Sequence, residues 1–390
     1  MVVFSCLGKR NLKRCLIDIT MHVLVTGGAG FIGAHTTNML IDSGFRVRVV
    51  DNLDPQIHKH LPAHLNQKAE FIRGDITHPD TWEKALKGTD AVLHLAAMTG
   101  IGQSMYEPSS YFRTNTLGTA LLYETLLKRR GLRRQIKKII VASSKTIYGE
   151  GTYLCRRDGL VYPPLRTLEQ LKRMEWDVRC PLCQEPAVPT GTKEEKPPQN
   201  LSIYALTKYS TEVMSLLYGN ALEIPTIAMR YFSAYGPYQS LSNPYTGVCS
   251  IFLSLLKNRK PPVIYEDGNQ LRDFVYVEDI ARANLLALER DATGVYNIGS
   301  GVGTRIRDIA DALINVLGIN IQPTITQEFR VGDTRCDFAD ISKAKREFGF
   351  SPQWTLRRGL EKLVEWGQQE YAEDLFEKAE RERKAAFGGG

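Results

Sequence analysis

The sequence predicts an α/β protein with a doubly wound parallel sheet and a smaller C-terminal lobe. Three observations lead to this fold class. Short runs rich in β-branched residues alternate with segments of helical spacing, and a glycine-rich turn follows the first run. A chain of 390 residues with 43% hydrophobic content is also long enough for two domains.

The expected strands are spaced so that a helix fits between each pair. The first five runs are HVLVTG, RVRVVD, AEFIRGD, AVLHLAA and KKIIVASS, over residues 22–27, 46–51, 69–75, 91–97 and 137–144. Two later runs, PTIAMRYF at 225–232 and GVYNIG at 294–299, predict further strands of the same sheet. Strands joined through helices pair in parallel, so helices should cover both faces of the sheet.

These runs suggest how the chain is divided. We expect an N-terminal extension over 1–20, because the first strand begins at Met21, which is also an alternative start. The sheet domain is expected over 21–232, with one further strand near 294–298 and an insertion over 151–198. A C-terminal lobe over 233–375 and a charged, flexible tail over 376–390 complete the chain.

Charge and hydropathy exclude two kinds of partner. The net charge of +7 is modest, and its densest run, residues 128–138, has no aromatic platform, which favours a solvated helix end over a nucleic-acid site. No run approaches the ~18 apolar residues of a membrane span, and the first 20 residues lack the apolar run of a signal peptide. The cytoplasm is therefore expected. Seven cysteines, an odd number and mostly scattered, do not indicate disulfides.

The glycine-rich turn VLVTGGAGFIGAH predicts a dinucleotide site, and with it a Rossmann sheet. Glycines at this point allow a tight turn, a close approach to a diphosphate and tight helix packing, and the helix that follows directs its amino terminus at the phosphates. Asp51 ends the second strand near the spacing of ~20 residues expected for an acid that binds ribose hydroxyls, which favours NAD over NADP. The expected cofactor residues here are Gly27, Gly30, Phe31, Ile32, Gly33, Asp51 and Asn52.

A second pattern, SIYALTKYSTE, places Tyr204 and Lys208 four residues apart on one face of a helix. A phenol with a pKa near ~10 is a poor base at neutral pH, and a neighbouring ammonium should favour the phenolate. Tyr204 is then the expected proton acceptor, and Ser144, at a strand end, is the third expected catalytic residue.

From about Met21 to Trp366 the chain resembles the extended short-chain dehydrogenase/reductases that act on nucleotide sugars, on the motifs TGGAGFIG, HLAA, SSKTIYG, YALTK, RYFSAYGP and LRDFVYVEDIARA. The resemblance implies that Lys208 holds the nicotinamide ribose. It also implies a homodimer in which the helix after EPSSYFRTN and the helix bearing Tyr204 pack as a four-helix bundle. It implies further cofactor contacts at Asp75, Ile76, Leu95, Ala96, Ala97, Asn115 and Phe232. It implies a nucleotide-diphosphate sugar as substrate, bound by Ser144, Thr146, Arg272, Arg330 and Asp333.

The strand end at residues 144–146 distinguishes reactions within that family. In the dehydratases of the family this strand end resembles Thr-Asp-Glu, because elimination of water needs an additional acid and base. The UDP-glucuronate decarboxylases resemble them in placing a glutamate where Thr146 stands. Ser144, Lys145 and Thr146 supply no carboxylate, so a 4-epimerase that works through a transient 4-keto sugar is expected. Lys145 is expected to point away from Ser144 into solvent, because successive strand residues alternate in direction.

Three segments together look like the dTDP-L-rhamnose 4-epimerases, which interconvert dTDP-L-rhamnose and dTDP-6-deoxy-L-talose. They are AAMTGIGQSMYEPSSYFRTNTLGTA, RYFSAYGPYQSLSNPYTGV and the cysteine-bearing insertion after YGEG. UDP-glucose and UDP-glucuronate 4-epimerases are the alternatives, although the latter usually carry an arginine where Gly102 stands. Ser233 also replaces the asparagine common in RYFN sequences. A non-catalytic protein of the same fold that only binds NAD is a further alternative, which an intact set of Ser144, Tyr204 and Lys208 disfavours.

The insertion over 151–198 contains two short clusters, CRRD and CPLC. Cysteine pairs at this spacing are typical of a structural zinc site, with Cys155, Asp158, Cys180 and Cys183 as the four ligands. Aspartate is a permissible but weaker ligand than histidine. Free thiols in a degenerate loop are the alternative.

Overall fold

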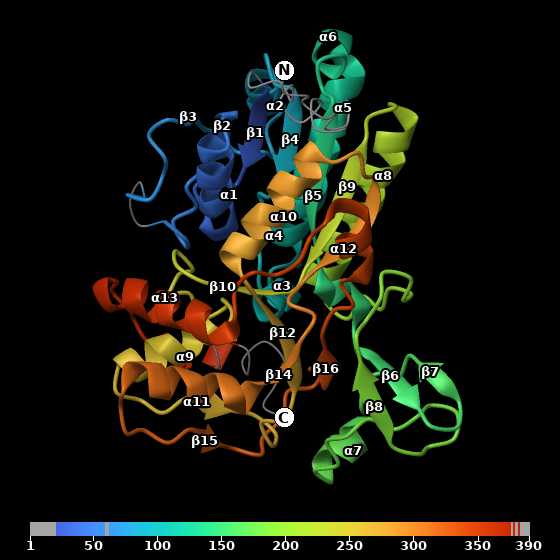
Figure 1. The fold of residues 1–390 in the computed structure, drawn as a ribbon, viewed down its shortest axis with the longest axis vertical. Helices are drawn as coiled ribbons and strands as arrows, with labels where there is room; N and C mark the ends of the chain where they lie inside the picture. The colour runs from blue at the N-terminus through green and yellow to red at the C-terminus, as the bar shows by residue number, and fades with distance from the viewer. Residues whose placement is uncertain (1–20, 59–61, 376, 379–380, 383–390) are drawn as a thin grey trace, which may run out of the picture.

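The structure is a computed structural model that describes residues 21–58, 62–375, 377–378 and 381–382. Its centre is a parallel sheet of seven strands in the order β13-β9-β5-β4-β1-β2-β3 (Figure 1). In that order the strands are Gly294–Ile298, Thr226–Tyr231, Lys138–Ser144, Ala91–His94, His22–Thr26, Arg46–Asp51 and Glu70–Arg73. The predicted doubly wound sheet is confirmed.

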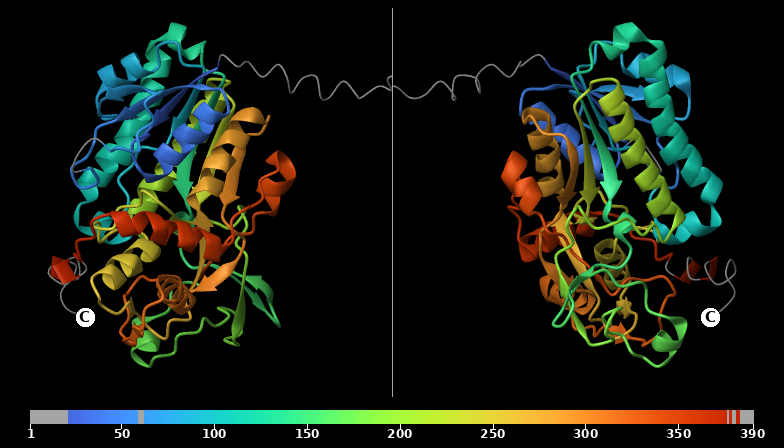
Figure 2. Two further views of the ribbon diagram at one scale, coloured as in Figure 1. Left: turned by 60° about the vertical axis from the view of Figure 1, so that its left-hand side comes forward. Right: turned by 90° about the vertical axis from the view of Figure 1, so that its right-hand side faces the viewer.

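Alternation along each strand builds a core on each face of the sheet. In β1, Val23 and Val25 belong to one buried cluster and Leu24 belongs to the other, as expected for successive side chains in a strand. One face is covered by α1 (Phe31–Asp42), α10 (Val277–Glu289) and α12 (Ser342–Phe348). The other carries α2 (Pro79–Ala85), α5 (Gly118–Lys128) and α8 (Ile203–Ala221), and the last two lie side by side in Figure 2.

Shorter helices fill the connections between β4 and β5. They are α3 (Ile101–Tyr106), α4 (Pro108–Tyr111), a π-helical segment (Phe112–Leu117) and α6 (Arg130–Arg133).

The smaller lobe lies beyond the carboxyl ends of the central strands (Figure 1). Its sheets contain β10 (Ser233–Tyr235), β12 (Leu271–Tyr276), β14 (Gly303–Arg305) and β16 (Cys336–Asp337), together with the pair β11 (Val263–Ile264) and β15 (Thr324–Ile325). Three helices, α9 (Val248–Lys257), α11 (Ile306–Leu317) and α13 (Leu356–Gln369), pack on it. Their apolar faces form a separate core, so the lobe has its own packing.

The insertion folds as a small antiparallel sheet beside this lobe (Figure 1). Strand β6 (Thr152–Cys155) pairs with both β7 (Gly159–Val161) and β8 (Ala187–Thr190), and α7 (Leu168–Lys172) lies between β7 and β8 in the chain. Thr152 and Thr190 are direct partners, so the insertion leaves and re-enters the domain at neighbouring points.

No helix within the described residues is both long and apolar enough to cross a membrane. The expected extension over 1–20 and most of the expected tail over 376–390 lie outside the described residues.

Candidate active site

The site lies at the carboxyl edge of the central sheet. Strand β1 has β2 on one side and β4 on the other, so the chain winds away in opposite directions from this point. Such a switch point opens a crevice in which ligands bind. The ends of β1, β2, β4, β5 and β9 all reach this edge, and they carry most of the residues expected to contact the cofactor.

The turn after β1 has the shape that a diphosphate requires. Gly27 has a φ of +69°, and a Cβ there would lie 2.8 Å from the backbone of Ala96. At Gly33 a Cβ would lie 2.0 Å from the carbonyl oxygen of Gly27. Gly30 is the N-cap of α1 and offers no side-chain cap, so the first N–H groups of α1 are available to an anion. Phe31 and Ile32, in the first turn of α1, pack against the core of the lobe.

Asp51 is fixed at the end of β2 by two backbone donors. Its Oδ2 accepts a hydrogen bond of 3.1 Å from the Ala29 N–H, and its Oδ1 accepts one of 2.9 Å from Leu53. Next to it, Asn52 Nδ2 donates to Asp75 Oδ2 at 3.4 Å. The carboxylate therefore has a fixed position beside the glycine turn, where a ribose would lie.

Two further expected cofactor residues are mainly buried by the protein itself. Ile76 is 5% exposed, and a Cβ on Gly118 would approach its side chain to 2.7 Å. The amide of Asn115 spans two elements: its Oδ1 accepts from the Met98 N–H at 2.8 Å, and its Nδ2 donates to Thr207 Oγ1 at 3.0 Å. Asn115 thus holds the segment after β4, which contains Leu95, Ala96 and Ala97, against α8.

The three expected catalytic residues come from β5 and α8. Ser144 is the last residue of β5, and Tyr204 lies in the first turn of α8. That helix begins at Ser202, whose hydroxyl accepts from the Ala205 N–H at 3.1 Å. Ser144 lies close enough to Tyr204 to affect the pKa of its phenol, and Lys208 is buried one turn further on. Phe232, which follows β9, is 4% exposed beside this group.

Burial is the largest cause of the pKa shifts of Tyr204 and Lys208. It raises the pKa of Tyr204, and the hydrogen bond from Ser144 lowers that pKa only in part. Burial also lowers the pKa of Lys208 to about 8. The expected net lowering of the tyrosine pKa is therefore wrong for the protein alone, because loss of water around the phenol outweighs the effect of its neighbours. Ser144 is itself oriented by Thr146, whose Oγ1 donates to it at 2.9 Å.

Lys145 does not point into solvent as expected. Its ammonium forms an ion pair with Asp337, and the two side chains are only 15% and 11% exposed. The alternation argument fails because β5 ends at Ser144, and Lys145 starts a 3₁₀ turn over Lys145–Tyr148. Asp337 lies on β16 beside Arg272 of β12, so this pair joins the catalytic strand to the lobe. Burial, with Arg272 nearby, lowers the pKa of Lys145 well below its ordinary value.

Glu212 is a residue that sequence reasoning missed. It accepts a 2.6 Å hydrogen bond from Ser143 and a two-point contact from Arg230 at 2.6 and 3.0 Å. All three side chains are buried, so the interaction fixes α8 against β5 and β9 directly behind the catalytic group. Its position four residues after Lys208, on the same helix face, was the signal that could have revealed it.

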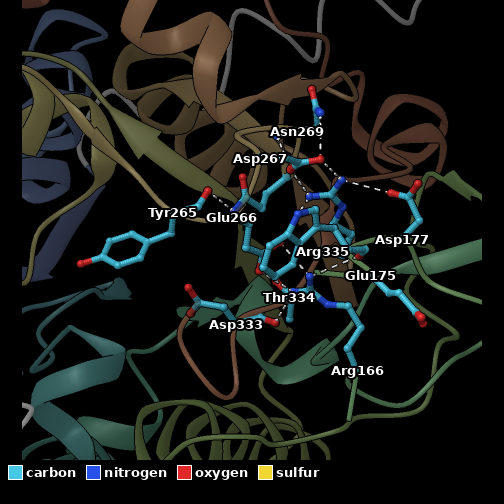
Figure 3. Close-up of polar contacts among 12 residues, drawn as sticks. Arg166, Glu175, Asp177, Tyr265, Glu266, Asp267, Asn269, Asp333, Thr334 and Arg335 are labelled. Carbon is cyan, nitrogen blue, oxygen red and sulfur yellow. Dashed lines mark hydrogen bonds and ion pairs between the residues drawn. The ribbon is translucent and has the colours of Figure 1, made fainter. Parts of the chain in front are cut away.

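Three of the five residues expected to bind substrate lie on β12 and on the segment 328–335 of the lobe, whereas Ser144 and Thr146 lie at the end of β5 and in the turn after it. Arg272 donates to the carbonyl oxygens of Leu271 and Thr334 at 2.8 and 2.7 Å. The guanidinium of Arg330 lies 4.1 Å from the ring centroid of Tyr265. The carbonyl oxygen of Asp333 accepts from Arg166, a residue of the insertion, at 3.0 Å (Figure 3). The N–H of Asp333 also donates to the carbonyl oxygen of Arg330 at 3.1 Å, so the three residues belong to one connected part of the lobe.

The four expected metal ligands converge. The ligand atoms of Cys155, Asp158, Cys180 and Cys183 all lie within 4.8 Å of one another. Cys155 Sγ is 3.5 Å from Cys183 Sγ, and Asp158 Oδ2 is 3.4 and 3.2 Å from the sulfur atoms of Cys155 and Cys180. A tetrahedral zinc site with Zn–S bonds of ~2.3 Å separates its sulfurs by about 3.8 Å, close to this arrangement.

Comparison with known proteins agrees with the geometry. The NAD dependent epimerase/dehydratase family matches residues 23–170 and 182–299. A dTDP-L-rhamnose 4-epimerase of Burkholderia thailandensis is 36% identical over 89% of this chain and 95% of its own length. A putative UDP-glucose 4-epimerase of Methanocaldococcus jannaschii is 32% identical over 88% and 97%.

Solved structures of similar proteins show the same fold. The UDP-glucose 4-epimerase of Thermotoga maritima, solved with UDP-glucose, is 31% identical, covers 90% of this chain and 99% of its own, and has a TM-score of 0.74. The UDP-glucuronic acid 4-epimerase of Bacillus cereus, solved with UDP-glucuronic acid and NAD, is 28% identical with coverages of 90% and 100% and a TM-score of 0.73. The chain therefore belongs to the NAD dependent epimerase/dehydratase family, and within it to the nucleotide-sugar 4-epimerases.

Proposed function

We propose that the enzyme interconverts dTDP-L-rhamnose and dTDP-6-deoxy-L-talose. The observation that carries the reaction type is that Ser144 and Tyr204 lie close together, at a strand end that has no carboxylate at residues 145 and 146. The dTDP sugar is supported by the 36% identical relative of that activity. UDP-glucose is the second candidate, because several relatives carry that name. The glycine at position 102 favours a sugar without a carboxylate over UDP-glucuronate.

The residues of the chain divide the chemistry among themselves. Ser144 hydrogen-bonds the 4-hydroxyl of the sugar, and Tyr204 removes its proton while Lys208 holds the nicotinamide ribose. When bound, NAD supplies the acceptor and then the donor of the hydride at C4. The 4-keto sugar turns over between these events, and Tyr204 returns the proton to the same oxygen. One C–H bond and one O–H bond are broken and remade, so no net oxidation occurs.

Substrate labelled with deuterium at C4 should keep its label through turnover in ordinary water, because hydride leaves and returns at one carbon. NMR of dTDP-L-rhamnose incubated with the purified enzyme should show both C4 epimers with deuterium retained. As a control, dTDP-glucose should give no 4-keto-6-deoxy product, because residues 144–146 lack the acid pair. Release of the label to solvent would contradict the keto mechanism and indicate deprotonation at carbon. Turnover of UDP-sugars alone would select the second candidate, and NAD binding without any turnover would support the non-catalytic alternative.

The enzyme should be purified with NAD and should bind NADP at least about tenfold more weakly. The carboxylate of Asp51 accepts hydrogen bonds from the ribose hydroxyls of NAD. The 2′-phosphate of NADP would lie at contact distance from this carboxylate, and the repulsion would cost about a few kcal/mol even near the surface. Titration of both cofactors into the NAD-depleted protein measures the ratio, and Asp51→Asn should reduce it. Equal affinities in the unmodified protein would contradict the assignment.

We also propose a homodimer formed through α5 and α8. Four leucines at these helices are between 38% and 66% exposed, although the helices pack on each other: Leu117, directly before α5, Leu127 in the last turn of α5, and Leu206 and Leu217 in α8. Apolar side chains on a paired helix surface favour contact with a second copy. Leu217→Asp should shift sedimentation toward the monomer. Val188→Asp, equally exposed at 66% but on the insertion, should not.

We further propose that Cys155, Asp158, Cys180 and Cys183 hold one structural zinc ion. Three thiols and a carboxylate within reach of one centre fit the four-ligand preference of zinc. The five cysteines in the described part of the chain are free, which agrees with a reducing compartment, and we propose the cytoplasm. Metal analysis of the purified enzyme and cell fractionation test these two assignments.

A further inference from the structure

We propose that the metal site of the insertion controls substrate binding, because it fixes the two side chains that hold the nucleotide-binding segment 328–335. This inference rests on the proposed nucleotide-sugar function. It gives the insertion a role beyond decoration of the lobe: Arg166 and Asp177 act as positioning residues for Arg330 and Asp333.

The metal ligands close the part of the insertion that carries these side chains. Cys155 and Cys183 are separated by 28 positions in sequence, and Arg166 and Asp177 both lie between them. Asp177 is three residues before Cys180. A bond between the two ends of a segment this long removes much of its conformational freedom. Backbone N–H groups of Asp158 and Leu182 already point at Cys155 Sγ and Cys180 Sγ, both at 3.4 Å, as turns that hold metal-bound sulfur do.

Arg166 is the first of the two connections to the segment (Figure 3). Its side chain is 2% exposed and makes a two-point contact with Glu266, at 2.7 and 2.8 Å. It also donates to the carbonyl oxygen of Asp333 at 3.0 Å and to that of Trp176 at 3.2 Å. A guanidinium in this geometry fixes direction as well as distance, so it fixes the backbone at Asp333.

Arg335 is the second connection, two residues further along the same segment. It contacts Asp267 at 2.6 and 2.9 Å, Glu266 at 3.2 Å and Asp177 of the insertion at 3.1 Å. The network in Figure 3 therefore alternates cations and anions across the boundary between insertion and lobe. Arg166 and Arg335 share Glu266, whose backbone N–H donates to the carbonyl oxygen of Glu328 at 2.7 Å. Movement of the insertion is therefore transmitted to both ends of the turn that carries Arg330 and Asp333.

Loss of the metal should release the segment without affecting the cofactor. The cofactor residues lie at the carboxyl edge of the central sheet and on α1, whereas the metal ligands lie on β6 and its neighbours. Coupling between two sites of a protein typically changes affinity by about 5- to 150-fold. We expect the affinity for the nucleotide to fall by on the order of tenfold when the metal is removed, and the affinity for NAD to stay the same.

The experiment uses the full-length holoenzyme and two nucleotide probes, dTDP and UDP. Zinc content, calorimetric titration of each nucleotide, NAD affinity and hydrogen exchange of residues 328–335 are measured before and after chelation, and again after zinc is restored. Cys180→Ser should lose zinc and reproduce the chelated state. Asp158→His should retain zinc at chelator concentrations that strip the wild type, because imidazole is a stronger ligand than carboxylate for this ion.

A matched arginine pair separates the connection from general effects on the insertion. Arg166→Met should weaken nucleotide binding on the order of tenfold while zinc stays bound, because the metal site does not need this side chain. Arg173→Met, which removes an exposed pair with Glu175, should change nucleotide affinity by less than about threefold. Retained NAD binding in each variant shows that the domain is folded.

Several results would overturn the inference. The first is a purified protein that, with its thiols reduced, neither contains nor takes up zinc. The second is a nucleotide affinity, and a hydrogen exchange of residues 328–335, that do not change when zinc is removed. The third is a wild-type protein that binds neither dTDP nor UDP. If nucleotide binding follows zinc but no sugar is epimerised, the inference holds and the proposed substrate falls.

Discussion

Tyr204→Phe should lower epimerase turnover by ~10²–10⁴-fold, the usual contribution of a general acid or base. In the proposed mechanism the phenol takes the proton from the sugar hydroxyl, and it lies close to Ser144. Phenylalanine keeps the ring that packs edge to face against Tyr111, so the fold and NAD binding should be retained. Turnover is measured from steady-state rates with the substrate that the NMR experiment identifies, and NAD binding is measured by titration.

Two controls sharpen this result. Ser144→Ala should lose less turnover than Tyr204→Phe, because the serine orients the oxygen and does not accept its proton. Tyr209→Phe removes a hydroxyl from the same helix outside the catalytic group and should leave turnover nearly unchanged. If Tyr204→Phe and Tyr209→Phe behave alike, Tyr204 is not the base.

Glu212→Ala should destabilise the protein by ~3–5 kcal/mol, the cost of leaving one member of a buried ion pair without its partner. Arg230 is 4% exposed and its contact with Glu212 has two points, so its charge would remain buried without the carboxylate that pairs with it. Ser143 would lose its acceptor at the same time. Urea denaturation of the mutant and the wild type, both saturated with NAD, measures the difference in free energy of unfolding.

Glu361→Ala is the matched control for this prediction. It also removes a glutamate that pairs with an arginine, Arg357, four residues away on one helix, but that arginine is 85% exposed. Exposed pairs of this kind contribute about 0.3–0.5 kcal/mol. Similar losses in the two variants would mean that burial does not determine the strength of the Glu212 interaction.

The predictable part of this protein is the part coded by local pattern. Runs such as HVLVTG and RVRVVD predict strands, and their alternation with helical segments predicts parallel pairing. The turn after the first strand requires backbone conformations that few residues other than glycine adopt. Tyr204 and Lys208 were found because a helix repeat brings them to one face. The four proposed metal ligands could be selected because CRRD and CPLC share one spacing, and the structure brings their ligand atoms together.

Long-range contacts explain what could not be predicted. Lys145 was assigned to solvent because a strand was extrapolated by one residue, and its partner Asp337 stands 192 positions away. The raised pKa of Tyr204 depends on how much protein surrounds the phenol, which no spacing in the sequence reports. Arg166 has no local motif at all, and its role follows only from the distant Glu266 and Asp333.

The pairing of β6 with β8 has a consequence for the way such enzymes can be recombined. Thr152 and Thr190 are paired across β6 and β8, so the segment between them starts and ends at neighbouring points. It could therefore be moved to a relative as one block without changes to the central sheet. Its contacts with the lobe make a transplant of the block alone incomplete. Arg166 and Asp177 meet Glu266 and Arg335, which the recipient would have to supply. A block designed for exchange should therefore be discontinuous, and it should include the residues of the lobe around 266 and 335 together with the insertion.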